Sequence, residues 1–455
     1  MAVWSEVLFE DVARSTRFDA EYYQPKFLRY DAMAIKSGGA LSKFVPRIIQ
    51  PNEFIREYVE AEEGMTFWRA QNVRCGYVDA DNVEYIDFQT FEGVKNAHVE
   101  EGDILITRTG ANAGDCAVVP PNTAGVAVSS HTLRLIPKSV EMGYAIGGFF
   151  ASDFGRDILF RSVSGSSRPQ ITKEMLNALV LPDFSSIADE MASIIRAAYA
   201  KRAASKTIYA EAEALLLDAL GLNDLDATHA ITYERNFAEV ARAGRYDAEY
   251  FHTRYVGVID AVKAREHALL RRHAQAHSGY PWKSEYFLES GEPGEPFIRI
   301  RDCKPGTIDN AELSRLDAEY AIGERAVKAE ASDLVVGMDG VNYFYASLLR
   351  ESCFVNQRVC RVALHVDAPF SAEYALLVLN SRVGQSQLLR EKTIAQTVAH
   401  ITNENVRDLL IPLLPDGLRA DLSRMVKESI AARDDAQSLL EQAKRRVEDL
   451  IEEGA

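Results

Sequence analysis

The sequence predicts an α/β (α+β) protein built from two repeated mixed α/β domains, each followed by a long helix. One observation is an internal repeat, because RFDAEYY at residues 17–23 returns as RYDAEYF at residues 245–251, 228 positions later. Matches continue through both halves, and the offset has grown only to 230 where Pro182 matches Pro412. The other is that apolar residues recur at intervals of three and four over about 35 residues after each of these prolines. A repeat held in register over such a distance indicates two copies of one folding unit.

The same elements are predicted in the same order in both halves. In the first half, strands are expected at 66–73, 84–87, 102–110, 115–120 and 131–137, a helix at 141–163 and a closing strand at 176–182. In the second half, strands are expected at 296–303, 331–340, 344–350 and 357–366, a helix at 371–392 and a closing strand at 406–415. We therefore assign mixed domains to residues 1–182 and 223–414, and long helices to residues 183–222 and 415–455.

Each long helix carries a narrow apolar stripe flanked by Ala, Glu, Lys and Arg, and no proline interrupts it. At 1.5 Å per residue, each helix would be about 50 Å long. A narrow stripe on so long a helix favours a partner helix, and the repeated helix is the nearest one. We therefore expect the two helices to pair as an antiparallel intramolecular coiled coil. The alternative is that each helix lies flat on its own domain.

Composition narrows the function without naming it. The 455 residues carry a net charge of −16, and the acidic excess is spread over both domains and both helices. Screening confines each charge to about 10 Å in physiological salt, so local basic surfaces for phosphate are compatible with this total. Five isolated cysteines, an acidic N-terminal segment and the lack of a long apolar run indicate a reduced, cytoplasmic chain without a zinc site, an export signal or a membrane span.

The common catalytic motifs are missing from the sequence. It contains no GxxxxGK[ST], HExxH or GxSxG pattern, and no GxGxxG after a predicted strand. Ser130 beside His131, and Cys360 near His365, have no visible third member of a catalytic group. The sequence therefore predicts a protein that is not an enzyme and that holds no metal or cofactor of its own.

Three classes of loop carry polar side chains suited to binding. The first follows the strand at 102–110 and corresponds to 338–345, the second spans 164–170 against 393–400, and the third lies at the first shared strand. The candidates in the first domain are Arg69, Gln71, Asn72, Arg74, Arg108, Asn112, Arg168 and Gln170. The candidates in the second domain are Arg299, Arg301, Lys304, Asn342, Tyr343 and Gln396. Arg, Lys, Asn and Gln can hydrogen-bond to base edges, and glycine and serine let the backbone approach phosphate.

Each of these loops, taken alone, is also compatible with an ordinary turn. The comparison between the halves is more informative, because equivalent loop positions carry different polar residues while the frame positions match. This pattern is expected if two copies of one fold bind two different ligands. A basic stretch at 264–283 has no counterpart in the first half, and it either follows phosphate or forms a solvated helix face.

The ordered series of motifs, present twice, resembles the specificity subunits of type I restriction-modification systems. The resemblance rests on R[FY]DAEY at the start of each half, the strand GDILITRTG, the IT…L…LP exit and the long helix, and it covers essentially the whole chain. The second copy departs from the pattern at VVGMDG, where Met338 stands in the place of Arg108. This difference argues against a direct DNA contact by residue 338.

The resemblance implies a non-catalytic DNA-recognition subunit that serves in phage defence. Two target-recognition domains would each bind one half of a bipartite, asymmetric site in double-stranded DNA, and the paired helices would fix the spacing. Two methyltransferase subunits would be partners and would hold S-adenosylmethionine, with motor and nuclease subunits in a full restriction complex. We expect Arg69, Arg74, Arg108, Arg168 and Gln170 at the first half-site, and Arg299, Arg301, Lys304, Asn342 and Gln396 at the second.

The motif shared by both halves is expected to be structural, because identical residues cannot distinguish two different half-sites. We expect Arg17, Asp19, Glu21 and their copies to lock the start of each domain against a long helix. Two other classes of function stay open. One is a defence-system adaptor that is built from the same repeat and acts without a methyltransferase. The other is an enzyme whose active site assembles between the halves, which the missing motifs disfavour.

Overall fold

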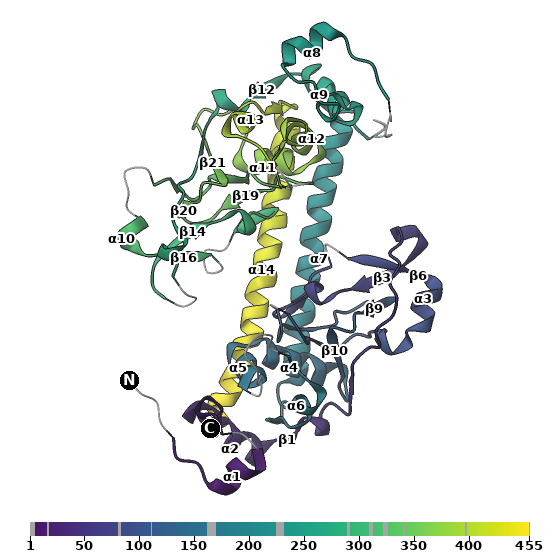
Figure 1. The fold of residues 1–455 in the computed structure, drawn as a ribbon, viewed down its shortest axis with the longest axis vertical. Coiled ribbons are helices and arrows are strands. Elements are labelled where there is room, and N and C mark those ends of the chain that lie inside the picture. The colour runs from purple at the N-terminus through teal and green to yellow at the C-terminus, as the bar shows by residue number, and fades with distance from the viewer. Residues whose placement is uncertain are drawn as a thin grey trace. The chain divides into compact units, whose positions relative to one another are not determined.

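The computed structural model describes residues 5–15, 18–80, 83–110, 112–161, 170–223, 232–288, 292–308, 313–321, 326–340, 342–395 and 398–454. The chain divides into two units, of which unit 1 comprises residues 1–203 and 433–455 and unit 2 comprises residues 204–432. The long helices α7 (Ala188–Ala219) and α14 (Asp416–Gly454) each contribute one part to each unit. Both helices are drawn unbroken in Figure 1.

Unit 1 is built around two small sheets. The main sheet has the antiparallel order β2-β10-β7-β8, and the smaller sheet has the order β6-β3-β9, in which β3 and β9 are parallel. The strands are β1 (Gly39–Ala40), β2 (Arg47–Ile49), β3 (Gly64–Trp68), β4 (Val73–Arg74), β5 (Tyr77–Val78), β6 (Glu84–Asp87), β7 (Ile104–Thr107), β8 (Cys116–Val118), β9 (Val126–Val128), β10 (Thr132–Ile136) and β11 (Val180–Leu181). The helices are α1 (Phe9–Ser15), α2 (Pro25–Ser37), α3 (Phe88–Gly93), α4 (Val140–Ala151), α5 (Asp153–Arg161) and α6 (Lys173–Asn177).

Unit 2 follows the same plan. Its main sheet has the order β13-β21-β18-β19-β15, and its smaller sheet has the order β16-β14-β20-β17. The strands are β12 (His267–Leu269), β13 (Ala274–Ser278), β14 (Glu295–Ile298), β15 (Gly306–Ile308), β16 (Ser314–Leu316), β17 (Lys328–Ala329), β18 (Leu334–Gly337), β19 (Ala346–Leu349), β20 (Cys353–Val355), β21 (Val359–Leu364), β22 (Thr393–Ala395), β23 (Val398–His400) and β24 (Leu410–Pro412). The helices are α8 (Phe237–Ala243), α9 (Thr253–Lys263), α10 (Ala318–Ala321), α11 (Ala372–Asn380), α12 (Arg382–Glu391) and α13 (Asn403–Arg407).

The strand order confirms the predicted repeat. The strands β2, β10, β7 and β8 of unit 1 correspond in order to β13, β21, β18 and β19 of unit 2. The pairing agrees in detail, because the Thr107 N–H donates to the Asp115 carbonyl at 2.8 Å and the Gly337 N–H donates to the Tyr345 carbonyl at 3.0 Å. These two bonds are separated by the 230 residues that the sequence matches predict. The predicted class of two repeated mixed α/β domains with long helices is confirmed.

A serine breaks the predicted helix over residues 141–163 into α4 and α5, and a second serine breaks its counterpart into α11 and α12. The Ser152 hydroxyl donates to the Phe149 carbonyl at 2.8 Å and accepts from the Gly155 N–H at 3.1 Å. Ser381 donates to the Val378 carbonyl at 2.8 Å in the same way. Serine satisfies the backbone groups exposed at a helix end, so one continuous helix in each half was the wrong expectation.

The long helices pack against each other within each unit, in opposite directions. In unit 1 the start of α7 meets the end of α14, where Arg446 bonds Glu190 at 2.9 Å and Lys201 bonds Asp435 at 2.7 Å. In unit 2 the end of α7 meets the start of α14, and their apolar side chains share one core. The predicted antiparallel pairing is therefore confirmed.

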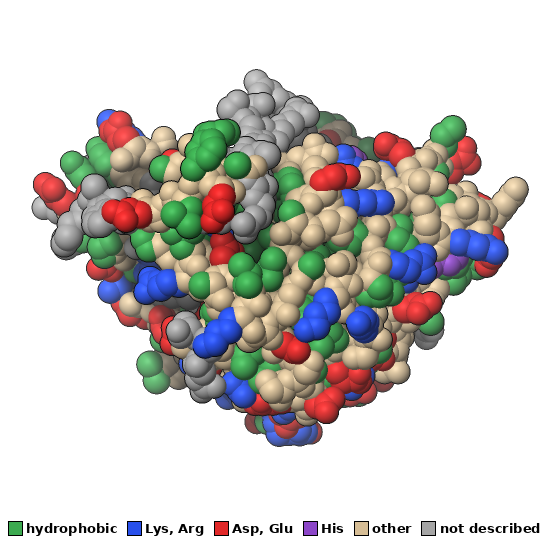
Figure 2. Space-filling model, turned by 90° about the horizontal axis from the view of Figure 1, so that it is seen from below, with side chains coloured by type: hydrophobic (Ala, Val, Ile, Leu, Met, Phe, Trp, Pro, Cys, Tyr) green, Lys and Arg blue, Asp and Glu red, His purple; other side chains and the backbone are tan. Residues whose placement is uncertain are grey.

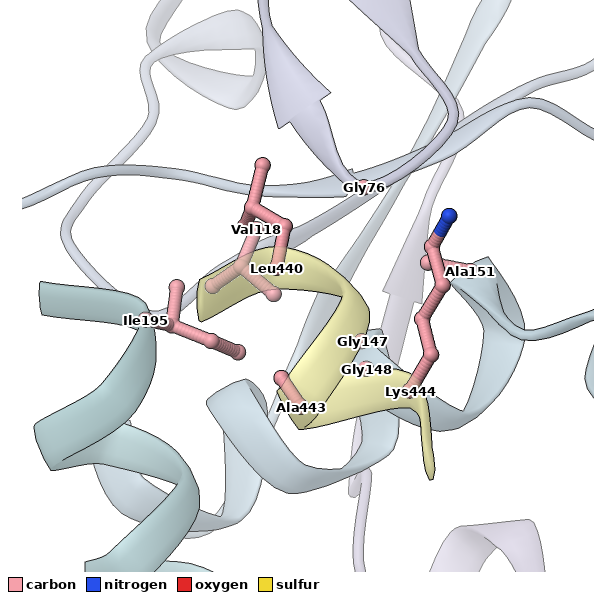
Figure 3. A pocket seen from close by; sticks show the side chains of 9 residues that line it. All are labelled: Gly76, Val118, Gly147, Gly148, Ala151, Ile195, Leu440, Ala443 and Lys444. Atoms are coloured by element: carbon pink, nitrogen blue, oxygen red, sulfur yellow. The ribbon is translucent and has the colours of Figure 1, made fainter. Parts of the chain in front are cut away.

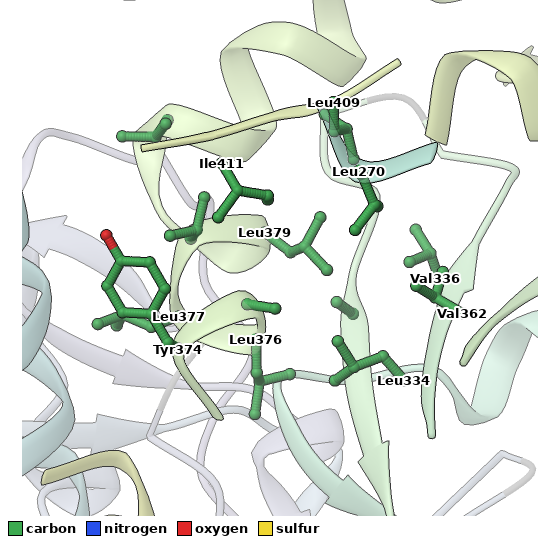
Figure 4. Packing of buried hydrophobic residues seen from close by; sticks show 14 of the residues in the cluster. Leu270, Leu334, Val336, Val362, Tyr374, Leu376, Leu377, Leu379, Leu409 and Ile411 are labelled. Carbon is green, nitrogen blue, oxygen red and sulfur yellow. The ribbon is translucent and has the colours of Figure 1, made fainter. Parts of the chain in front are cut away.

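Each unit has its own core, and the two cores are equivalent. In unit 2, leucines, isoleucine and valines from β18, β21, α11 and β24 point toward one another, and Tyr374 lies at one side of this cluster (Figure 4). The Tyr374 hydroxyl donates to the Pro412 carbonyl at 2.9 Å, so its polar end is satisfied in the core. In unit 1 the equivalent Tyr144 is also fully buried and donates to Glu101 at 3.2 Å.

An ion pair lies at the start of a central strand of each main sheet, and it is buried in unit 1 and partly buried in unit 2. In unit 1 the Arg134 Nε donates to Asp103 at 2.6 Å, and in unit 2 the Arg361 Nε donates to Asp333 at 2.6 Å. Each carboxylate also accepts the backbone N–H three residues before it, at 2.9 Å and 2.8 Å. The acidic residue shared by both halves therefore holds the turn that starts β7 or β18.

The shared opening motif is held by an arginine in both units. The Arg161 guanidinium lies 4.1 Å from the Tyr22 ring centroid and donates to the Tyr22 carbonyl at 2.8 Å. Arg390 lies 4.0 Å from the Tyr250 ring and donates to the Tyr250 carbonyl at 3.1 Å. These arginines come from α5 and α12, so the contact observed is with those helices and not with a long helix. Arg17 lies outside the described residues.

Acidic and basic side chains are mixed on the molecular surface. On the face drawn in Figure 2, Lys and Arg lie among Asp and Glu, with apolar side chains scattered between them. Within the ranges that the structure describes, no helix is both long enough and apolar enough to cross a lipid bilayer.

Candidate nucleic-acid interface

The first candidate loop of unit 1 lies at the end of β7, and we name Arg108, Thr109, His131 and Gln170 the β7 edge. The Arg108 N–H donates to the His131 carbonyl at 2.8 Å, and Thr109 forms a backbone bridge with Gln170. The Thr109 hydroxyl lies 3.2 Å from His131 Nδ1. Two loops that are 60 residues apart in sequence therefore meet at one end of the sheet.

The side chains of Arg108 and Gln170 interact directly. With the Gln170 amide oxygen turned toward the guanidinium, it accepts from Arg108 Nε at 3.0 Å and from Nη2 at 2.6 Å. Arg108 is half-buried and Gln170 is exposed. An arginine held by an acceptor loses less side-chain entropy when it binds a ligand than an unrestrained one. The structure thus brings together two of the predicted residues.

A glycine turn follows the β7 edge. Gly110 and Gly114 have φ angles of +99° and +92°, which favour glycine, and a Cβ at Gly114 would lie 2.6 Å from the Phe160 ring. Asn112 is half-buried between them and accepts the Asp115 N–H at its carbonyl, at 3.0 Å. Burial raises the pKa of Asp115, while Arg156 and Arg74 oppose this shift. Arg74 therefore contributes positive potential at this turn.

The equivalent position in unit 2 lies at the end of β18, and we name Met338, Asp339, Arg358 and His400 the β18 edge. The Met338 N–H donates to the Arg358 carbonyl at 2.9 Å, and Asp339 forms a backbone bridge with His400. The backbone thus repeats the β7 edge, with Met338 in the place of Arg108. Met338 as a whole residue is 7% exposed, which fits the predicted lack of a DNA contact by this residue.

An ion pair replaces the Thr109–His131 contact at the β18 edge. Arg358 Nη1 lies 3.5 Å from Asp339 Oδ1, and the two side chains are 54% and 22% exposed. A cation is therefore present at this edge, but it comes from the turn that precedes the neighbouring strand β21.

Two tyrosines stand beside the β18 edge. Tyr343 and Tyr345 stack with ring centroids 5.4 Å apart and planes 9° apart, and both are exposed. Phe344 between them is buried, and its backbone is held by Gln385, which accepts the N–H at 2.9 Å and donates to the carbonyl at 3.0 Å. Stacked exposed aromatics offer a surface for a base or a sugar. Asn342, next to them, is also exposed.

The third loop of unit 1 combines exposed and structural residues. Asn72 is only 2% exposed, and its amide accepts from the Arg69 N–H at 2.8 Å and donates to the Asp79 carbonyl at 2.9 Å. The Arg69 guanidinium bonds Glu84 at 2.8 Å. Gln71 is exposed and Arg74 is half-buried. Asn72 thus holds the loop, and its role at a ligand stays a prediction.

The corresponding loop of unit 2 gathers positive charge around Ser314. Arg299 and Arg301 both donate to the Ser314 hydroxyl, the latter at 3.1 Å. The Arg299 guanidinium also lies 5.4 Å from the ring centroids of Phe287 and Phe297. Lys304 is exposed, and its backbone is held by Ser347.

Arg168 and Gln396, which the sequence also suggests, lie outside the described residues. The structure also brings Arg358, His131, His400 and Tyr345 to the two edges. None of them is among the named candidates, although His400 and Tyr345 lie in the candidate loops 393–400 and 338–345. Arg358 and His131 lie within the predicted strands 357–366 and 131–137, so the sequence did not mark them as loop residues.

The basic stretch at 264–283 is not a helix. It forms β12, a 3-10 turn and β13, so the interpretation as a solvated helix face is wrong. Arg271 in this stretch is paired with Glu404 at 3.3 Å and with Asp408. Contact with phosphate stays a prediction.

A small pocket in unit 1 lies away from the β7 edge, where α14 crosses α4. It has room for about one water molecule. Figure 3 shows it between Gly147, Gly148 and the side chain of Lys444. Because a Cβ at Gly147 would lie 2.0 Å from Val118, these glycines serve helix packing. Among the described residues, no three His, Cys, Asp or Glu side chains are grouped as for a metal ion.

Sequence comparison identifies a relative for part of the chain. Over 170 residues, which are 37% of this chain, it is 27% identical to the specificity subunit of the type I restriction enzyme EcoBI from Escherichia coli. The resemblance predicted from the motifs is confirmed. The match covers 33% of the EcoBI subunit, about a third of that relative's length. No protein-family model matches the sequence.

Two solved specificity subunits align over most of the chain at low similarity. The type I restriction-modification S subunit from M. genitalium aligns over 91% of this chain and 94% of its own, with 11% identity and a TM-score of 0.44. The HsdS subunit from Thermoanaerobacter tengcongensis aligns over 90% and 96%, with 14% identity and a TM-score of 0.29.

Proposed function

We propose that this chain is the non-catalytic DNA sequence-specificity subunit of a type I restriction-modification complex. In this role the two units bind the two halves of a bipartite, asymmetric site in double-stranded DNA, and α7 and α14 set the spacing. Two methyltransferase subunits that carry S-adenosylmethionine are the partners, joined in the full complex by motor and nuclease subunits.

One observation supports the proposal. The two units share the same structural contacts, but the β7 edge and the equivalent β18 edge carry different side chains. The ion pairs at Asp103 and Asp333 are the same in both units, whereas the β7 edge and the β18 edge carry different polar side chains. A protein that bound one ligand twice would need equal edges. A protein that reads two different half-sites needs equal frames and unequal edges.

The chemistry of the predicted side chains suits base and phosphate contacts. Arginine can bond guanine in a bidentate manner, and glutamine and asparagine can do so with adenine. We assign the first half-site to Arg69, Gln71, Asn72, Arg74, Arg108, Asn112, Arg168 and Gln170. We assign the second half-site to Arg299, Arg301, Lys304, Asn342, Tyr343 and Gln396.

The proposal is tested by co-expressing the chain with the methyltransferase encoded beside it and mapping methylated adenines by sequencing. We expect methylation within one bipartite motif. R108A should relax one position in one half of the motif, with about a 5- to 150-fold loss of discrimination, because a bidentate base contact is lost. R47A is the matched control, since Arg47 is exposed and lies at the opposite end of the same sheet, across from Ile136.

Two outcomes would contradict the proposal. One is methylation that ignores this chain, and the other is stable assembly with a partner that is not a methyltransferase. The second outcome would instead support a defence-system adaptor built from the same repeat.

A further inference from the structure

We propose that Arg358 is the guanine-reading residue of unit 2 and replaces, from the turn that leads into β21, the arginine that unit 1 carries at position 108. This inference rests on the proposed function and names a specificity-determining residue for the second half-site. It concerns a residue that the repeat does not align with Arg108 and that the sequence did not suggest.

The strand pairing places Arg358 beside the position of the missing arginine. Met338 is the direct counterpart of Arg108, because Ile171 donates to the Arg108 carbonyl at 3.0 Å and Ile401 donates to the Met338 carbonyl at 2.9 Å. The Arg358 carbonyl accepts the Met338 N–H at 2.9 Å, so the two residues lie side by side just beyond the pair Gly337 and Val359 that ends the β18–β21 ladder. Neighbouring strands lie about 4.8 Å apart, a distance that a long arginine side chain spans easily.

Arg358 is available to a ligand, whereas Met338 is not. The Arg358 side chain is 54% exposed, and the Met338 residue is 7% exposed. Methionine also lacks a hydrogen-bond donor, so residue 338 could not read a polar base edge even if it were exposed.

At both edges an acceptor side chain bonds the arginine. The segment that supplies the arginine in unit 1 corresponds to the one that supplies the acceptor in unit 2. In unit 1 the arginine follows β7, and the acceptor Gln170 comes from the segment that bridges to it. In unit 2 the acceptor Asp339 follows β18, and the arginine comes from the turn just before the neighbouring strand β21. A guanidinium that is bonded on one side keeps further N–H groups for a ligand, with fewer rotamers to lose.

The chemistry of the pair selects guanine. Arginine carries donors only, so its best partner in the major groove presents two acceptors, as guanine does with N7 and O6. The Asp339 carboxylate, left alone at the edge, would repel the negatively charged backbone of DNA. Its ion pair with Arg358 removes this penalty and orients the guanidinium. Asp339 is therefore a positioning residue.

The test uses the complex with the methyltransferase and compares methylated motifs. R358A is expected to relax one G·C position, about 5- to 150-fold, in the half-site that R108A leaves unchanged. R358K keeps the charge and loses the planar fork, so it should bind DNA but discriminate as poorly as R358A. D339N should relax the same position to a smaller degree, with the other positions and the spacing unchanged.

R272A is the matched control, because Arg272 is an exposed arginine that directly precedes His273 at the far end of the equivalent sheet, near the pair Ala274 and Leu364. The inference is wrong if R358K and R358A leave both half-sites unchanged while the wild-type complex methylates a bipartite motif. It is also wrong if they weaken methylation equally at all sites, which would indicate a phosphate contact. Absence of any motif with the wild-type chain would instead overturn the proposed function.

Discussion

Single residues contribute measurably to the stability of each unit, and the clearest case is the ion pair of Asp103 with Arg134 and its counterpart, Asp333 with Arg361. The pair in unit 1 is more enclosed, since the side chains of Asp103 and Arg134 are 4% and 8% exposed. Those of Asp333 and Arg361 are 12% and 25% exposed. Removing one member of a buried pair leaves the other charge without a partner, and the cost grows with enclosure.

We expect D103N to lower the stability of unit 1 by about 3–5 kcal/mol, because Arg134 would remain buried and uncompensated. D333N should cost less, since solvent reaches Arg361. Hydrogen exchange of the amides in β7 and β18 measures each effect in its own unit. E100Q removes one charge from an exposed neighbour of Asp103 and should leave the exchange unchanged. Equal losses for D103N and D333N would contradict the enclosure argument.

Gln385 fixes the loop that carries the stacked tyrosines. Q385M removes both bonds to the Phe344 backbone at similar volume, and each unsatisfied buried group costs about 1–3 kcal/mol. We therefore expect faster amide exchange at residues 344–346 and loss of discrimination at the second half-site only. Q275M, at an exposed position of β13, is the control. Unchanged exchange in Q385M would show that the loop is held by other contacts.

The sequence predicted the frame well and the edges only in part. The matches Asp103 with Asp333 and Pro182 with Pro412 place both copies in register, because frame residues are selected for the same contacts twice. Arg358 could not be found in this way, since its place at the edge depends on the pairing of β21 with β18. Asn72 shows a second limit, because the sequence does not reveal that this amide in a polar loop is buried and bonded to the backbone.

At the scale of elements, the long helices do more than pair, because they also complete the cores. Ala212 and Leu216 of α7, together with Leu422 and Val426 of α14, belong to the core of unit 2. Both interpretations from the sequence are therefore partly correct, since each helix pairs with its repeat and also packs on a mixed domain. Sequence periodicity shows that a helix has an apolar face, but it does not show how many partners share that face.

One charged residue lies on α7 where the helix packs against unit 2. Burial raises the pKa of Glu213, opposed by a hydrogen bond from the Arg382 backbone N–H. Since the pKa in the folded state lies above the unfolded value, the contribution of Glu213 to stability is greatest at low pH. It falls as the pH rises through the folded-state pKa and stays low at neutral pH.

We expect E213Q to stabilise unit 2 at pH 7 and to flatten this part of the pH profile, because the amide can still accept from Arg382. Urea unfolding between pH 4 and pH 7.5 measures the difference. E211Q, on an exposed face of the same helix, is the control and should follow the wild type. A pH profile of E213Q parallel to that of the wild type would contradict the assignment.

At the scale of the whole molecule, the spacing of the half-sites is proposed to follow helix length. The pairs Lys201 with Asp435 and Ser205 with Ser429 lie on either side of the boundary between the units. Seven residues inserted after Ala203 in α7 and after Ala432 in α14 keep the apolar stripe nearly in phase and keep the pairs of each unit in register.

This double insertion should lengthen the preferred spacer by about three base pairs, from about 10 Å of added helix, with both half-sites unchanged. Sequencing of methylated sites measures the spacer. Insertion into α7 alone is the control, and it should abolish methylation because the pairs lose their register. A double insertion that leaves the spacer unchanged would show that α7 and α14 do not set the spacing.

The division of α14 between the units has a consequence for synthesis. The core of unit 1 includes Ala443, Val447 and Ile451, which the ribosome adds after the whole of unit 2. Domains commonly fold during translation in the order in which they emerge. Unit 1 emerges first, but its core cannot be completed until α14 has been made. A stop codon early in α14 would therefore destabilise unit 1 as well as unit 2.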